Sequence, residues 1–173
     1  MRSILNTAGV AFTVRDYRRS DFARLWQIDQ LCFPEGIAYS QEELRAYIAK
    51  ANGITLIGEL TASGGDAATN APAQSAERIV GFVTAHAIRR RYGRILTLDI
   101  LPHARRLGLA SKLMEECERR LSACGCREVY LETAVNNQPA LRLYRKLGYE
   151  VLGTLPEYYS SHSLDAFQMG KRL

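Results

Sequence analysis

The chain has 173 residues, of which 47% are hydrophobic and 24% charged, and its formal net charge is +5. This length suits one well-packed domain, and the composition excludes a fibrous or largely disordered chain. No apolar run approaches the roughly 18 residues of a bilayer-spanning segment, and the first residues lack the long apolar core of a signal peptide, so we expect a cytoplasmic protein without a membrane segment.

The first elements in chain order are a strand beginning near Phe12 and two helices. In the first helix, Leu25 and Ile28 recur at helical spacing after a polar N-cap. The second helix follows Ser40, because Ser40 and Glu43 have the spacing of a capping box.

Apolar and β-branched runs at 52–60 and 78–88 predict two strands that pair with each other. The segment between them, 61–77, is rich in Ala, Gly, Ser and Thr. Because the flanking strands need each other, we interpret this segment as a flexible inter-strand loop and the whole chain, 1–173, as one domain. A further strand is expected over 94–102.

The second half of the chain alternates helices and strands. Leu109, Leu113, Cys117 and Leu121 predict an amphipathic helix that ends at Gly125. A strand over 127–135, a short helix over 137–148 and two closing strands follow. This order predicts an α/β fold of the α+β type, with a central, mostly antiparallel mixed sheet flanked by about four helices.

The positive charge is clustered, which favours an anionic partner such as nucleic acid, an anionic cofactor or an acidic protein surface. Arg89, Arg90, Arg91 and Arg94 stand between two apolar runs, where a solvated hairpin tip and a contact surface both remain open. The four cysteines have no CxxC spacing and no nearby histidine pair, so we expect reduced thiols and no metal site.

The helix start near Arg105 has the features of an anion site. A helix N-terminus leaves about four backbone N–H groups without partners and carries roughly half a positive charge. Gly108 and Ala110 would let an anion approach those groups closely, and Arg105 and Arg106 would add charge-assisted hydrogen bonds. An ordinary polar turn is the alternative.

Glu132 is a carboxylate within the otherwise apolar strand REVYLETAV. Alternation places Val129, Leu131 and Thr133 on one face of this strand and Glu132 on the other. A charge there is costly unless something uses it, so Glu132 is either a base strengthened by removal from water or the partner of an arginine from an adjacent segment. Tyr144, on the next helix, is either a packed aromatic or a proton donor.

Three motifs in order resemble the GCN5-related N-acetyltransferase (GNAT) superfamily. They are Arg105-x-x-Gly108-x-Ala110, Asn137-x-x-Ala140-x-x-Leu143-Tyr144 followed by KLGY, and the closing EYYSSHSLDAFQM. The last motif is similar to the N-terminal acetyltransferase branch typified by the ribosomal-protein alanine acetyltransferase. Two positions depart from that branch: Ala110 stands for a commoner glycine, and Asp99 for a small apolar residue.

The resemblance implies acetyl-coenzyme A (acetyl-CoA) as cosubstrate, with no metal. It implies that the pantetheine arm pairs with the backbone of Leu98, Asp99 and Ile100. It implies further cosubstrate contacts from Arg105, Arg106, Leu107, Gly108, Leu109, Ala110, Ser111, Asn137 and Tyr144. In the family pattern Glu132 accepts the amine proton, often through water, and Tyr144 protonates the departing thiolate in a direct transfer.

The acceptor follows partly from amine chemistry. An α-amino group has a pKa of roughly 8 and a lysine side chain one of about 10.4, so deprotonating lysine at neutral pH costs about 3 kcal/mol more. This favours a protein or peptide N-terminus. There are three alternatives. The acceptor could be a small amine, or the protein could be a non-catalytic CoA-binding sensor or ribosome-associated module. The third, a nucleic-acid binder, is supported by charge alone. The oligomeric state is left open.

Overall fold

The computed structural model describes residues 4–5, 11–61, 78–89 and 91–173. The loop expected over 61–77 lies outside these residues, except for Thr61 at the end of a strand, so its flexibility stays a prediction. Arg90 also lies outside them.

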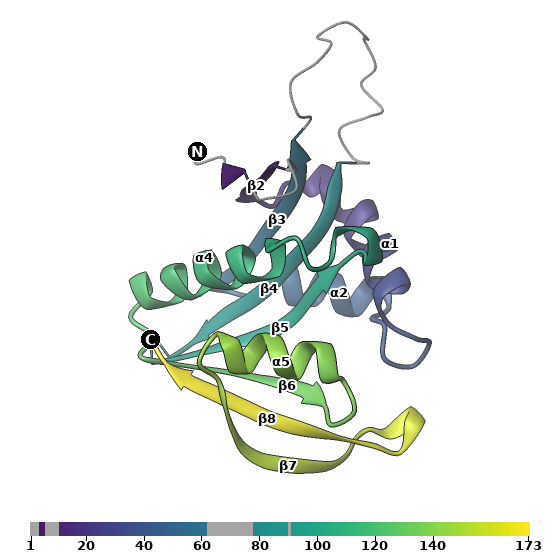
Figure 1. Cartoon of the computed structure of the whole chain (residues 1–173), viewed down its shortest axis with the longest axis vertical. Coiled ribbons are helices and arrows are strands. Elements are labelled where there is room, and N and C mark those ends of the chain that lie inside the picture. The colour runs from purple at the N-terminus through teal and green to yellow at the C-terminus, as the bar shows by residue number, and fades with distance from the viewer. Residues whose placement is uncertain (1–3, 6–10, 62–77, 90) are drawn as a thin grey trace, which may run out of the picture.

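Within the described residues, eight strands form one sheet in the spatial order β1-β2-β3-β4-β5-β6-β8-β7 (Figure 1). Their bounds are β1 Ile4–Leu5, β2 Ala11–Asp16, β3 Gly53–Thr61, β4 Ile79–Ile88, β5 Tyr92–Ile100, β6 Glu128–Ala134, β7 Glu150–Tyr159 and β8 Leu164–Arg172. Neighbouring strands are antiparallel except β5 and β6, which are parallel. The predicted mostly antiparallel mixed sheet is confirmed.

Four α-helices cover the sheet in the described part of the chain: α1 Phe22–Cys32, α2 Gln41–Ile48, α4 Leu109–Ala123 and α5 Gln138–Lys146. Helix α4 lies across β2 to β5 on one face, while α1 and α2 pack against β3 to β5 on the opposite face (Figure 1). Short 3-10 turns occupy Arg19–Asp21, Pro102–Ala104 and Ser160–His162.

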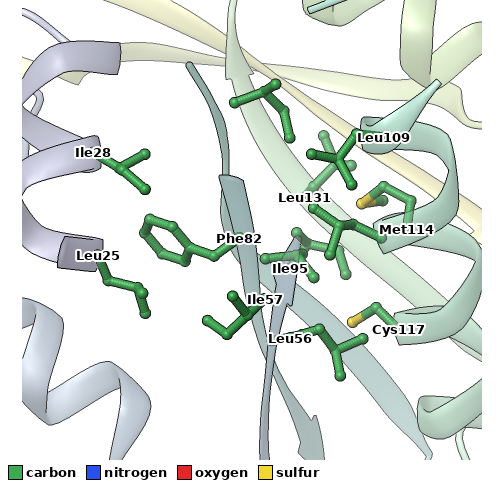
Figure 2. Packing of buried hydrophobic residues seen from close by; sticks show 14 of the residues in the cluster. Leu25, Ile28, Leu56, Ile57, Phe82, Ile95, Leu109, Met114, Cys117 and Leu131 are labelled. Carbon is green, nitrogen blue, oxygen red and sulfur yellow. The ribbon is translucent and has the colours of Figure 1, made fainter. Parts of the chain in front are cut away.

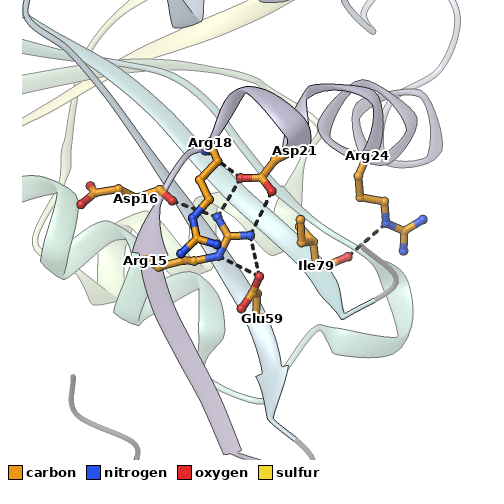
Figure 3. Close-up of polar contacts among 7 residues, drawn as sticks. All are labelled: Arg15, Asp16, Arg18, Asp21, Arg24, Glu59 and Ile79. Atoms are coloured by element: carbon orange, nitrogen blue, oxygen red, sulfur yellow. Dashed lines mark hydrogen bonds and ion pairs between the residues drawn. The ribbon is translucent and has the colours of Figure 1, made fainter. Parts of the chain in front are cut away.

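Side-chain caps that the sequence predicts begin two of the four described α-helices, α2 and α5. The capping box before α2 is present, since the Glu43 N–H donates to Ser40 Oγ at 3.2 Å and the Ser40 N–H donates to Glu43 Oε2 at 2.9 Å. At the start of α1, Asp21 instead accepts from the Arg18 N–H at 2.7 Å and pairs with Arg15 (Figure 3). Arg15 also pairs with Glu59 at 2.6 Å, so one guanidinium joins β2, the turn before α1 and β3.

The hydrophobic core has two layers, one on each side of the sheet (Figure 2). Leu25 and Ile28 of α1 pack toward Phe82 on one side. Met114 and Cys117 of α4 fill the other. Burial of this apolar area, at about 25 cal/mol per Å², holds the helices against the sheet and makes it a rigid support.

Among the described helices, none is long and apolar enough to cross a membrane. All four cysteines carry free thiols, as expected. No group of three or more metal-binding side chains occurs among the described residues.

Candidate active site

The parallel ladder between β5 and β6 is short. It joins only Tyr92, Gly93 and Arg94 to Glu128, Val129 and Tyr130. Beyond Arg94 the two strands diverge, while β5 stays paired with β4 as far as Ile100 (Figure 1). In the described structure, therefore, residues 95–100 of β5 have no strand partner on the β6 side. We call this divergence the β5–β6 fork.

A β-bulge in β5 changes the direction of the side chains that enter the fork. Thr84 of β4 lies opposite Thr97 and Ala85 lies opposite Ile95, so Leu96 is an extra residue. Ile95 packs on the α4 side of the sheet (Figure 2). Asp99 lies opposite Phe82, whose ring points toward α1. The bulge thus directs the side chain of Asp99 toward α1, which leaves only its backbone at the edge of the fork.

Glu132 lies on β6 directly beside the fork and pairs with Arg94. The guanidinium donates to Glu132 Oε2 from Nη2 at 3.0 Å and from Nε at 3.2 Å. The Glu132 side chain is 11% exposed and the Arg94 side chain 39%. Among the described residues nothing donates to Glu132 Oε1. The predicted alternation of β6 is confirmed, and so is the interpretation of Glu132 as the partner of an arginine. One oxygen of the Glu132 carboxylate remains available to accept a proton.

Tyr144 is a buried residue of α5, with its ring centroid 5.7 Å from that of Tyr149. Burial raises the pKa of Tyr144 above its ordinary value, and the nearby Asp99 and Tyr159 raise it further. The hydroxyl therefore holds its proton at neutral pH. Tyr159 also interacts electrostatically with Glu132, so it lies close to both predicted catalytic residues.

The start of α4 is built as the anion hypothesis requires. Gly108 occupies the N-cap in the left-handed region at φ 89°, and Arg106 is left-handed at φ 64°. No side chain caps the helix, and its first turn contains no acidic residue. A Cβ on Gly58 would stand 2.7 Å from Leu109, so the helix start packs closely on β3. Arg105 Nε donates to the Ile100 carbonyl at 2.8 Å, so it secures the end of β5.

Asn137 caps α5, as the sequence predicts. Its Oδ1 accepts from the Ala140 N–H at 3.3 Å, and Pro139 stands in the first turn. This leaves the amide nitrogen of Asn137, which makes no hydrogen bond to the described residues, for a ligand.

The structure adds side chains whose roles the sequence analysis missed. Arg94 Nη2 donates to the Tyr158 hydroxyl at 3.2 Å, which links β5 to β7 across the fork. Tyr39, from the segment between α1 and α2, donates its hydroxyl to the Leu96 carbonyl at 3.2 Å. The sequence pointed to Arg94 only as a member of the arginine cluster. No periodic pattern in the sequence pointed to Tyr39. Two surface hollows, at Asp16 and at Lys171, lie away from the fork.

The chain is similar to known acetyltransferases. A family model described as acetyltransferase (GNAT) family matches residues 22–149. An N-alpha-acetyltransferase of Sulfurisphaera tokodaii is 28% identical and covers 95% of each chain. Arabidopsis thaliana NAA60 in complex with acetyl-CoA shares the fold at TM-score 0.78 and 24% identity, covering 94% of this chain and 98% of its own. The ribosomal-protein-S18-alanine N-acetyltransferase of Escherichia coli does so at TM-score 0.74 and 18% identity, covering 93% of both chains.

Proposed function

The chain belongs to the acetyltransferase (GNAT) family, and on that premise we propose that it transfers an acetyl group from acetyl-CoA directly to the α-amino group of a protein or peptide N-terminus. It is an N-acetyltransferase, as predicted from its motifs. The predicted cytoplasmic location stays a prediction.

One arrangement supports the catalytic part of the proposal: Glu132, a carboxylate with one free oxygen, and Tyr144, a protonated phenol, both interact electrostatically with Tyr159 at the end of β7. Glu132 Oε1 accepts the amine proton, directly or through water, while Arg94 holds Oε2. Tyr144 donates its proton to the leaving thiolate. Because the acid and the base are different groups, one accepts the amine proton and the other supplies the thiol proton within a single transfer.

Acetyl-CoA supplies the acetyl group as a thioester. We propose that the backbone of Leu98, Asp99 and Ile100 pairs with its pantetheine arm, since that edge of β5 has no strand partner among the described residues. The amides from Arg106 to Ser111 and the Arg105 and Arg106 guanidinium groups would bind the pyrophosphate. Asn137 would donate its free amide N–H.

The α-amine is the acceptor that this site suits. It loses its proton more readily than a lysine side chain, by about two pH units, and Glu132 is the single carboxylate that the proposal assigns to accept that proton. The similarity to an archaeal protein named N-alpha-acetyltransferase supports the same acceptor.

Mass spectrometry of peptides incubated with the protein and acetyl-CoA tests the proposal. We expect a mass gain on the N-terminal amine of some peptides and none on peptides that are blocked there but contain lysine. Acetylation only of small amines would indicate a small-amine acetyltransferase. Acetyl-CoA binding without any product would indicate a binding module.

A further inference from the structure

Two buried aspartates face each other between α1 and β5. Asp29 and Asp99 are both 0% exposed, and their carboxyl groups lie within hydrogen-bonding reach of one another. Asp29 Oδ2 accepts from the Tyr39 N–H at 2.8 Å and from Gln30 Nε2 at 3.1 Å. Asp99 Oδ1 accepts from the Thr97 hydroxyl.

The remaining oxygen of each aspartate, Oδ1 of Asp29 and Oδ2 of Asp99, is buried and has no donor. Two ionised carboxylates in contact and out of water would repel strongly, whereas a single proton between them satisfies both oxygens. Burial raises the pKa of both groups, that of Asp29 to about 6 and that of Asp99 well above its ordinary value. At neutral pH the proton therefore lies on Asp99 and is donated to ionised Asp29.

The other groups that act electrostatically on the pair do not replace this proton. Arg105 is a cation near Asp99, but its Nε donates to the Ile100 carbonyl rather than to either aspartate. The remaining titratable groups around the pair are Cys32, Tyr39, Glu43 and Tyr144. Most of these are neutral at pH 7, so the pair keeps its own proton.

The pair is joined to the active site through Tyr39. The Tyr39 N–H donates to Asp29. The Tyr39 carbonyl accepts from Trp26 Nε1 at 3.2 Å and from Gln30 Nε2 at 2.8 Å. The Tyr39 hydroxyl binds the bulged Leu96 at the fork. Tyr39 also interacts electrostatically with Tyr158, the residue that contacts Arg94.

We propose that Asp29 and Asp99 share one proton, and that this pair positions Tyr39 and the segment between α1 and α2 against β5 at the β5–β6 fork, where the proposed function places the reacting groups. The shared proton is inferred from the buried contact between the two carboxyl groups and does not depend on the proposed function. The effect on an acceptor rests on the proposed function.

The raised pKa values of Asp29 and Asp99 make the stability of the folded chain depend on pH. In the unfolded chain both aspartates lose their protons near pH 4, whereas the folded chain retains one proton on Asp29 until about pH 6 and one on Asp99 beyond it. Stability contributed by these protons is therefore present at low pH and falls as pH rises. Above about pH 6, and until Asp99 also ionises, the fall corresponds to roughly one proton, which is a tenfold change in the unfolding constant per pH unit.

Asp99→Asn tests the shared proton, because the amide donates permanently to Asp29 Oδ1 and its oxygen still accepts from Thr97. We expect the variant to lose this one-proton slope of stability against pH. The matched control is Asp16→Asn, whose side chain is 71% exposed and which should keep the wild-type slope. Infrared spectra of the wild type at neutral pH should show the carbonyl band of a protonated carboxylic acid, and Asp99→Asn should lack it. Equal slopes in wild type and Asp99→Asn, or no such band in the wild type, would overturn the shared proton.

The positioning of Tyr39 by the aspartate pair is tested by hydrogen exchange at the Tyr39 amide. The measured exchange rate is corrected for the intrinsic rate of that amide at each pH. As pH rises through the value at which the infrared band of the protonated acid disappears, protection should fall by roughly tenfold in the wild type and change little in Asp99→Asn. Asp29→Leu removes the acceptor of the Tyr39 N–H, and it should raise the KM for an acceptor peptide by about tenfold and leave acetyl-CoA binding unchanged. Unchanged Tyr39 protection in the wild type would refute the positioning role, even if Asp29→Leu does not fold. If no amine is acetylated at all, the proposed function fails while the infrared and exchange results still decide the pair.

Discussion

Glu132 illustrates how one residue satisfies two interpretations at once. Arg94 binds only Oε2, so the ion pair stabilises the charged carboxylate and orients it without occupying Oε1. The free oxygen Oε1 can therefore accept a proton while Oε2 stays bonded to Arg94. The ion pair and the catalytic base are therefore compatible.

Replacing either catalytic residue with a close isostere should lower turnover. We expect Glu132→Gln and Tyr144→Phe each to reduce kcat/KM by about a hundredfold, the usual contribution of a positioned general acid or base. Steady-state kinetics would measure this, and isothermal titration should show unchanged acetyl-CoA binding. Full activity in both variants would contradict the assigned roles.

Arg94→Gln should slow the reaction, because it removes the two guanidinium hydrogen bonds that orient the Glu132 carboxylate. We expect kcat/KM to fall by about tenfold, measured by steady-state kinetics. Arg91→Gln is the matched control, because Arg91 lies in the same cluster but stacks on the Tyr92 ring. If both variants keep the wild-type kcat/KM, Arg94 does not act on the base.

The start of α4 is the element on which cosubstrate binding depends. Gly108 holds φ 89°, a region that residues with a Cβ adopt only with strain. Its amide orientation, rather than any side chain, makes the helix start suitable for an anion.

Gly108→Ala should therefore weaken acetyl-CoA binding and lower the free energy of unfolding by about 1 kcal/mol. Titration calorimetry and urea unfolding would measure the two effects. Ala110→Gly provides the comparison: it lowers helix propensity at the same helix start but imposes no left-handed residue. Equal loss of acetyl-CoA affinity in both variants would indicate general loosening of the helix.

At the scale of the whole molecule, few contacts join the two halves of the sheet. The β5–β6 ladder covers three residue pairs, and the Arg94 bonds to Glu132 and Tyr158 add a side-chain link. A second link joins α4 to the C-terminal half, where Glu118 accepts from the Tyr149 hydroxyl at 2.8 Å and pairs with Lys171 at 2.6 Å. A ligand bound in the fork would connect both halves.

Acetyl-CoA should consequently protect a specific set of amides from hydrogen exchange. We expect slower exchange at residues 96–100 of β5, at the amides that point away from β4, and at the first turn of α4. Residues 92–94, already paired with β6, should change little. Protection confined to residues outside the fork would place the cosubstrate elsewhere.

The sequence by itself determined the element order from β2 onward, the capping of α2 and α5, the alternation in β6 and the family motifs, whereas it did not predict β1. These features depend on residues close together in the chain, so local spacing reveals them. Tertiary structure decided that Arg94, rather than another arginine, meets Glu132, because only the parallel contact of β5 and β6 brings them together. It also decided the environment of Asp99. The bulge at Leu96 turns this side chain to the α1 face, where it meets an aspartate 70 positions earlier, and no local pattern specifies such a pairing.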